Sequence, residues 1–183
     1  ASTVIKRITD QWTCTHPEVL SDSESITFCS MKMIKYKNGN VLIVQDDYIS
    51  EMMERRQMAN LNPNTIPMQP NECEDVISTD LSGLTVKEKS KNQAVQEAQS
   101  LCGELNWIST RTRPDISYAV SRASSLTMKE PERSVKICKS VIRFLKGTSD
   151  VGLLCLTKRN LERRREEFTD VVPLAETFDP KTV

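Results

Sequence analysis

The sequence predicts an α+β chain, in which a β-hairpin precedes a mainly helical region. Residues 26–45 (ITFCSMKMIKYKNGNVLIVQ) hold two runs rich in Ile, Val, Phe, Met and Tyr on either side of Asn38–Gly39, a pair suited to a two-residue type I′ turn. From residue 93 to residue 147, apolar residues recur every three or four positions, the period of helices with one buried side. These patterns divide the chain into a hairpin with a following helix, a flexible linker, a helical region and a charged tail, at residues 1–58, 59–92, 93–156 and 157–183.

The composition is that of a soluble, moderately polar chain. Of its 183 residues, 25 are Lys or Arg and 25 are Asp or Glu, so the formal net charge is zero and any nucleic-acid contact must rest on local basic patches. The six cysteines form no C-x-x-C pair, which favours reduced thiols and an intracellular protein of the cytoplasm or nucleus. The chain starts without Met, without a charged leader and without a long apolar run. We therefore expect a fragment or a processed product with neither a signal peptide nor a membrane span.

The first residues predict a short helix that ends in a loop. The apolar residues at helical spacing are Val4, Ile5, Ile8 and Trp12. Pro17 and a cluster of Ser and Asp residues then break the pattern. His16 is the only histidine, and no Cys, His or carboxylate lies near it at the spacing of metal ligands, so we expect a surface residue and no metal site.

Two adjacent aspartates, Asp46 and Asp47, follow the predicted hairpin. Adjacent carboxylates can hold a pair of Mg²⁺ ions for phosphoryl transfer. Here they directly precede a helical pattern, YISEMMERRQM, where an aspartate commonly caps unpaired N–H groups and is favoured by the helix dipole. We therefore expect a capping role, no catalytic residue and no cofactor in this chain. The linker that follows contains Pro63, Pro67 and Pro70 and then many polar residues, so we expect it to wrap the surface or to be disordered.

Residues 93–109 predict a helix with two distinct sides. Its apolar side is formed by Val95, Ala98, Leu101, Cys102, Leu105 and Ile108. Gln99, Gly103 and Trp107 fall together on the opposite side. A Gly inside a helix lowers stability by roughly 1 kcal/mol relative to Ala, so it commonly marks the close approach of another group. That group is either a neighbouring helix or an external ligand lying along the helix, and nucleic acid is one such ligand.

A short break at residues 110–113 precedes a second helix. Thr112 is a candidate cap for it, and Pro114 suits its first turn. The predicted buried residues are Ile116, Ala119, Val120, Ala123 and Leu126. Arg111 and Arg113 bracket the break, where each can bind a phosphate or a carboxylate such as Asp115.

A third helix is predicted over residues 131–147, with Gly147 as its stop signal. Its buried side is formed by Val135, Cys138, Val141, Ile142 and Leu145. A second stripe of helical period is basic, and we name it the basic stripe: Lys136, Lys139, Arg143 and Lys146, with Arg133 one turn earlier. Such a stripe either simply faces water or binds phosphates.

Three stretches carry a resemblance to a known family. LCGELNW, STRTRPDISYAVSRAS and VIRFLKGT, at residues 101–107, 109–124 and 141–148, resemble the segment that follows the palm in reverse transcriptases of copia-type retrotransposons. The resemblance implies that the hairpin comes from the end of the palm and that the helices form the thumb and connection. LCGELNW also resembles the first thumb helix of retroviral reverse transcriptases, which implies that Gln99, Gly103 and Trp107 follow the minor groove of the primer–template duplex. The family's paired catalytic aspartates would lie upstream, so Mg²⁺ is expected only in the complete polymerase. Cys29–Ser30 replaces the family's Leu-Gly, which puts the tightness of the hairpin in doubt.

The resemblance therefore implies a fragment of a Pol polyprotein that binds an RNA/DNA duplex without chemistry of its own. Its expected partners are the duplex and the rest of the polyprotein, with no membrane. The expected duplex-contacting residues are Gln99, Gly103, Trp107, Arg111, Arg113, Lys136, Lys139, Arg143 and Lys146. Two alternatives stay open: a domesticated module that binds another protein, and a translated remnant without function.

Overall fold

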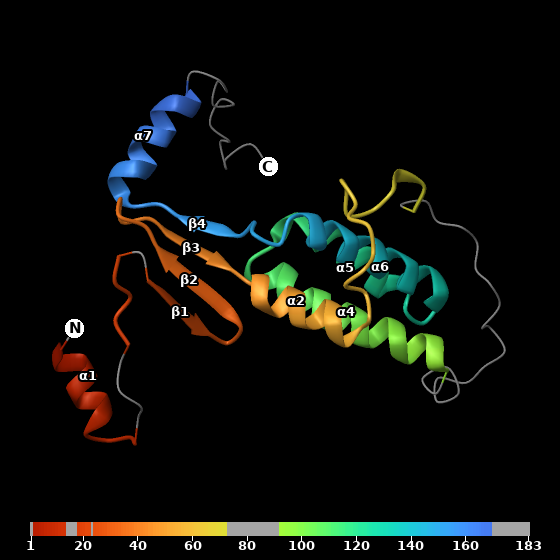
Figure 1. Cartoon of the computed structure of the whole chain (residues 1–183), viewed down its shortest axis with the longest axis horizontal. Coiled ribbons are helices and arrows are strands. Elements are labelled where there is room, and N and C mark those ends of the chain that lie inside the picture. The colour runs from red at the N-terminus through yellow and green to blue at the C-terminus, as the bar shows by residue number, and fades with distance from the viewer. Residues whose placement is uncertain (1, 14–17, 23, 73–91, 170–183) are drawn as a thin grey trace, which may run out of the picture. The chain divides into compact units, whose positions relative to one another are not determined.

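The computed structural model describes residues 2–13, 18–22, 24–72 and 92–169 (Figure 1). It confirms the α+β class, since a four-stranded sheet is combined with a set of helices. The chain forms two compact units. The first contains residues 1–26, 34–42 and 154–183, and the second contains residues 27–33 and 43–153. His16 lies outside the described residues.

The sheet has the strand order β1-β2-β3-β4. Its strands are β1 (Ser25–Phe28), β2 (Met31–Lys35), β3 (Val41–Val44) and β4 (Leu153–Cys155). The predicted pair of strands is thus three consecutive strands, because the first apolar run is itself divided by a turn. β4 comes from the far end of the chain and completes the sheet beside β3.

The two-residue turn of this sheet lies at Cys29–Ser30 and not at Asn38–Gly39, so the predicted position was wrong. Cys29 and Ser30 have φ angles of 50° and 60°, the paired positive values that a type I′ turn requires. The doubt about a tight turn at this pair was therefore unfounded. At the second turn only Gly39 has a positive φ, 82°, and the N–H of Tyr36 donates to the Asn40 carbonyl at 2.9 Å. This is a three-residue loop that ends in a left-handed glycine.

Among its described residues, the first unit contains two helices besides its part of the sheet. Helix α1 (Ser2–Thr9) is the predicted first helix, and Trp12 lies beyond its end. Its apolar residues are exposed, with Val4 at 62% and Ile8 at 49% of their maximal accessible area. Helix α7 (Lys158–Thr169) lies in the predicted charged tail.

Helix α2 (Asp46–Arg55) begins two residues before Tyr48, where the predicted helical pattern starts. Gln45 is the N-cap residue and makes no side-chain capping bond, so the prediction that an aspartate caps this helix was wrong. Asp46 and Asp47 lie in the first turn, where the helix dipole favours negative charge. Both carboxylates lie 3.1 Å from the Lys32 ammonium group.

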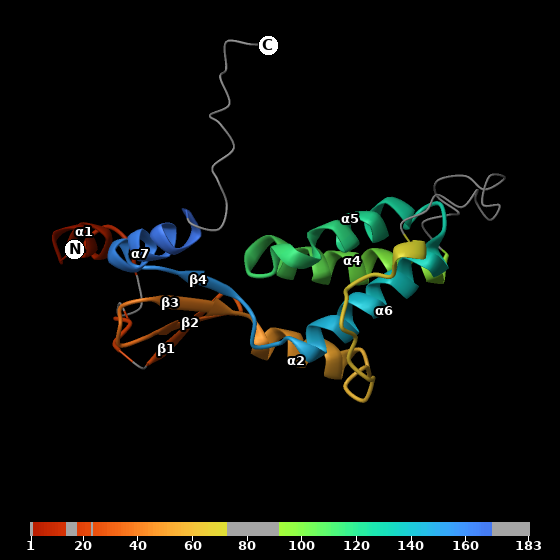
Figure 2. The same ribbon diagram turned by 90° about the horizontal axis from the view of Figure 1, so that it is seen from above.

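The core of the second unit is built by three helices that pack on one another, and α2 packs against the third of them (Figure 2). They are α4 (Gln93–Arg111), α5 (Ser117–Leu126) and α6 (Pro131–Gly147). Every apolar residue predicted to be buried on these helices is buried. The periodic pattern therefore predicted the inward faces correctly, and it leaves the opposite face of α4 outside the core.

The connections between these helices differ from the prediction in two places. Thr112 is the C-cap of α4, and Pro114 opens a short 3₁₀ turn, η2 (Pro114–Ile116), before α5 begins. The prediction that Thr112 caps the second helix was therefore wrong. Gly147 is the last residue of α6 and does not have a positive φ, so it is not a left-handed stop. A Cβ atom on Gly147 would lie 3.1 Å from Cβ of Pro63. The small size of the glycine therefore leaves room for Pro63.

Candidate nucleic-acid interface

One face of α4 carries four residues spaced one turn apart, which we name the α4 ridge: Gln99, Gly103, Trp107 and Arg111. Gln99, Gly103 and Arg111 are exposed, and Trp107 is half-buried. A Cβ atom built on Gly103 would meet no atom within 4 Å in the described part of the chain. Within the described part of the chain, the interpretation in which a neighbouring helix packs on Gly103 is therefore wrong. The glycine leaves an open notch in the middle of an exposed helix face.

The ridge ends in a stacked pair of side chains. The guanidinium carbon of Arg111 lies 4.5 Å from the centroid of the Trp107 ring, which is a cation–π contact. At the other end, the Gln99 amide donates only a weak bond, 3.6 Å long, to the sulfur of Met128. The ridge thus presents an amide, a bare backbone notch, an indole ring and a positive charge along about 18 Å of helix.

The acidic residues of α4 are compensated within the second unit. Glu104 pairs with Arg55 and Arg56 of α2 at 3.0 Å each. Glu97 lies 3.6 Å from the Lys139 ammonium group. Neither carboxylate therefore leaves uncompensated negative charge on the helix that carries the ridge.

Arg113 does not face outward. Its side chain is only 1% exposed, and it pairs with Asp115 at 2.8 Å. The Nη1 atom of Arg113 donates to the Thr148 carbonyl at 2.6 Å, and the guanidinium carbon lies 5.4 Å from the Phe144 ring centroid. Of the two partners considered for Arg113, the structure shows the carboxylate. The expectation that Arg113 meets phosphate is corrected, because its hydrogen bonds join the start of η2 to the end of α6.

The basic stripe of α6 is also engaged within the chain. Residues 59–72, which we name the strap, run along this side of α6 and include the 3₁₀ turn η1 (Pro70–Glu72). Arg143 donates to the Asn62 carbonyl at 2.7 Å, and Lys146 donates to the carbonyls of Ala59 and Leu61 at 2.6 and 2.8 Å. These two residues of the stripe therefore hold the strap.

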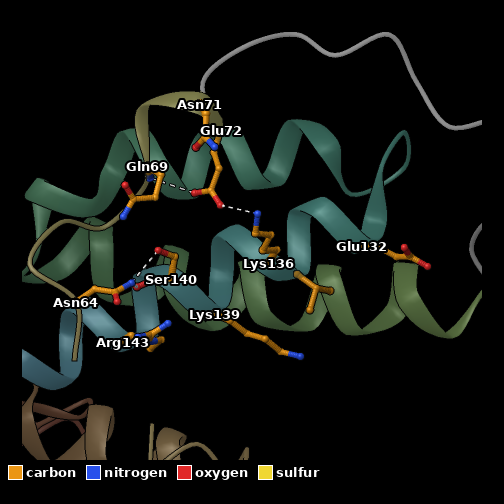
Figure 3. A pocket seen from close by; sticks show the side chains of 10 residues that line it. Asn64, Gln69, Asn71, Glu72, Glu132, Lys136, Lys139, Ser140 and Arg143 are labelled. Carbon is orange, nitrogen blue, oxygen red and sulfur yellow. Dashed lines mark hydrogen bonds and ion pairs between the residues drawn. The ribbon is translucent and has the colours of Figure 1, made fainter. Parts of the chain in front are cut away.

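Lys136 and Lys139 make looser pairs. Lys136 lies 3.5 Å from the Glu72 carboxylate, and 73% of its side chain is exposed (Figure 3). Lys139 pairs with Glu97 at 3.6 Å and is 46% exposed. The Lys139–Glu97 pair is exposed on both sides and contributes little stability, and the Lys136 side chain is exposed although its partner Glu72 is only 7% exposed. Lys136 and Lys139 can therefore exchange a carboxylate for a phosphate far more readily than Arg143 and Lys146 can release the strap.

Between the strap and α6 lies a polar pocket of about 410 Å³ (Figure 3). It is lined by Asn64, Gln69, Asn71, Glu72, Glu132, Val135, Lys136, Lys139, Ser140 and Arg143. The Asn64 amide donates to the Ser140 hydroxyl at 3.0 Å and holds the strap at one end of the pocket. The lining mixes both signs of charge, so the pocket has no clear preference for an anion.

The sequence did not predict the role of Arg55 and Arg56. Both pair with Glu104, which directly follows the ridge residue Gly103 in α4. Two adjacent arginines at the end of a helix were the available signal, but only the fold shows which carboxylate they meet. Among the described residues, no three His, Cys, Asp or Glu side chains are grouped as metal ligands. None of the described helices has the length and apolarity needed to span a membrane.

The chain is similar to a short part of transposon Pol polyproteins. It is 30% identical over 109 residues to the retrovirus-related Pol polyprotein from transposon RE1 of Arabidopsis thaliana. It is 29% identical over 120 residues to the corresponding polyprotein from transposon TNT 1-94 of Nicotiana tabacum, and 28% identical over 109 residues to that from transposon RE2 of Arabidopsis thaliana. These matches cover 60–65% of this chain but only 7–9% of each relative. No family model and no solved structure matches the chain.

Proposed function

We propose that the chain is the template–primer-binding part of a copia-type RNA-directed DNA polymerase and that the α4 ridge is its duplex-contacting surface. The observation that carries the proposal is the open notch at Gly103, which lies between an exposed amide and the Trp107–Arg111 stack. The similarity to transposon Pol polyproteins supports a nucleic-acid ligand over other classes. In this proposal the remaining parts of such a polyprotein are the protein partners.

The dimensions of the ridge favour a duplex that contains RNA. An α-helix with its side chains is about 10–12 Å across, whereas the minor groove of B-form DNA is only about 6 Å wide. The minor groove of an A-form duplex is wide and shallow and exposes the 2′-hydroxyl groups. Gly103 lowers the height of the ridge at its centre, and Gln99 offers both a donor and an acceptor. The ridge therefore suits the minor groove of an RNA/DNA hybrid better than that of DNA.

Binding of a labelled duplex, measured by fluorescence anisotropy, tests the proposal. We expect an RNA/DNA hybrid to bind more tightly than a DNA duplex of the same sequence. Gly103→Leu fills the notch and should weaken hybrid binding by about tenfold, a loss of roughly 1.4 kcal/mol. Ser125→Leu is the matched control, because it adds the same side chain at an exposed position of α5. Equal binding by the two variants would refute the assignment of the ridge.

The proposal includes no chemistry by this chain. The Asp46 and Asp47 carboxylates share the Lys32 ammonium group, an arrangement that suits a helix start rather than a pair of metal ions. We expect no primer extension by the purified chain with Mg²⁺ and nucleotides. Template-dependent extension that is lost on Asp46→Asn would overturn this part of the proposal.

A protein-binding module is the second candidate, and the exposed apolar residues of α1 favour it. Val4, Ile5 and Ile8 are 62%, 40% and 49% exposed, which is unusual for three apolar residues on one short helix. An apolar contact of this kind is insensitive to salt, whereas duplex binding weakens steeply as salt rises. A partner retained at high salt and released by Ile5→Asp would support this second candidate.

A further inference from the structure

The core of the second unit contains two cysteine sulfurs in contact. Sγ of Cys102 on α4 lies 3.6 Å from Sγ of Cys138 on α6, and both thiols are free. The Ser134 hydroxyl lies 3.7 Å from the Cys102 sulfur and donates to the Ala123 carbonyl at 2.8 Å. The sulfur atoms of a disulfide are about 2.05 Å apart, so the two sulfurs must approach by roughly 1.5 Å to be joined.

The two thiols differ in reactivity. The hydrogen bond with Cys138 lowers the pKa of Cys102 against the opposing effect of burial, and Ser124 and Ser134 add to the lowering. The same hydrogen bond, together with burial, raises the pKa of Cys138. Cys138 is fully buried, whereas Cys102 is 6% exposed. Cys102 is therefore the thiol that reacts first with a small oxidant, because the thiolate is the reactive form.

We propose that Cys102 and Cys138 are a redox-sensitive pair, which a peroxide converts into a disulfide that links α4 to α6. The Cys102 sulfur attacks one peroxide oxygen, so that an S–O bond forms, the O–O bond breaks and one water leaves with the thiol proton. The Cys138 sulfur then attacks the sulfenic sulfur of Cys102. An S–S bond forms, the S–O bond breaks, and a second water leaves with the Cys138 proton. Two thiols and one hydrogen peroxide thus give one disulfide and two waters.

The disulfide would fasten two helices of the core without changing the exposed face of α4. It closes a loop between residues 36 positions apart, which restricts the unfolded chain. We expect the midpoint of thermal unfolding to rise by about 5–10 °C on oxidation. The residues of the α4 ridge are exposed or half-buried, whereas Cys102 faces the core and is only 6% exposed, so the ridge should keep its exposure in both redox states.

Oxidation of a variant that keeps only this pair tests the proposal. This variant keeps Cys102 and Cys138 and has Ser in place of Cys14, Cys29, Cys73 and Cys155. The folded variant is treated with hydrogen peroxide, alkylated in denaturant and analysed by mass spectrometry. We expect a mass lower by two hydrogen atoms, no alkylated thiol, a cross-linked peptide that contains both cysteines, and reversal by dithiothreitol. Peptide mapping of the oxidised natural chain should give the same cross-link, which guards against a folding defect in the variant.

Single substitutions in the same background separate the two roles. Cys138→Ala should leave Cys102 as a sulfenic acid that dimedone traps, and Cys102→Ser should leave Cys138 unreactive in the folded chain. The proposal is overturned if both thiols of the folded chain remain alkylatable after peroxide treatment. It is equally overturned if Cys102 proceeds to a sulfinic acid while Cys138 stays reduced.

Discussion

Replacement of Arg113 by Ala should destabilise the second unit strongly. Arg113 is 1% exposed and donates to both Asp115 carboxylate oxygens, to the Thr148 carbonyl and to the Thr148 hydroxyl, at 2.6–2.9 Å. Loss of one member of a buried ion pair costs about 3–5 kcal/mol. The Asp115 side chain is 42% exposed and can be rehydrated, which lowers its share of the loss. The Thr148 carbonyl loses the bond from Arg113 but keeps the one from the Val151 N–H, so this loss adds only about 0.5–1.5 kcal/mol.

Because these contributions overlap, we expect Arg113→Ala to lower the free energy of unfolding by about 3–4 kcal/mol. For a chain of this size, that loss corresponds to a fall of roughly 6–16 °C in the unfolding midpoint. Urea unfolding followed by far-UV circular dichroism measures the change. Arg111→Ala is the matched control, since it removes an exposed arginine two residues away.

The control should lower the free energy of unfolding by no more than about 1 kcal/mol, the contribution of an exposed cation–π contact. It should also weaken hybrid binding, because Arg111 lies on the α4 ridge. Should Arg113→Ala lower stability no more than Arg111→Ala does, the buried position of the Arg113 guanidinium would be refuted. The original expectation, in which Arg113 meets phosphate, would then be restored.

Three further variants test separate parts of the structure. Gly103→Ala should raise the free energy of unfolding by about 0.5–1 kcal/mol, because Ala has the higher helix propensity and its Cβ would contact no other atom. A lower free energy of unfolding in urea would show that another group fills the notch. Lys136→Ala with Lys139→Ala should reduce the salt dependence of hybrid binding and change stability by less than about 1 kcal/mol; an unchanged salt slope would mean that these lysines meet only carboxylates. Gly39→Ala should destabilise the first unit by about 1–3 kcal/mol, because φ is 82° and the new Cβ would lie 2.9 Å from Thr157; thermal unfolding within a few tenths of a kcal/mol of the natural chain would contradict this.

The sequence predicted the buried faces of the helices well, because each apolar stripe is a local signal. From Val95 to Leu145, the residues expected in the core are in the core. The same period placed Gly103 and Trp107 on the exposed face of α4. Local spacing was sufficient in these cases because it fixes which residues share one side of a helix.

The errors lie where a local pattern allows two conformations. Asn38–Gly39 suits a two-residue turn, but the Asn38 side chain accepts a bond from the Asn40 N–H at 3.0 Å, and only Gly39 takes a positive φ. Cys29 and Ser30 carry no strong turn signal, yet both take positive φ angles. Their turn depends on the pairing of β1 with β2, which composition does not reveal.

The roles of the basic residues depend on contacts between distant segments. Arg111 and Arg113 are two positions apart, but α4 ends between them, so one is exposed and the other is buried. Arg143 and Lys146 belong to an apparently solvent-facing stripe and instead bind strap carbonyls more than 80 positions away. Helical period alone does not distinguish a stripe that faces water from one that holds another segment.

The most direct test is the affinity of the natural chain and of Trp107→Ala for an RNA/DNA hybrid, measured over a range of salt concentrations. The account predicts saturable binding that weakens steeply with salt, since phosphate contacts release counterions. It also predicts a loss of about tenfold for Trp107→Ala, with most of the natural chain's stability retained, because Trp107 is only half-buried. An affinity that does not change with salt concentration, or an unchanged affinity of Trp107→Ala, would contradict the assignment of the α4 ridge to a nucleic-acid duplex.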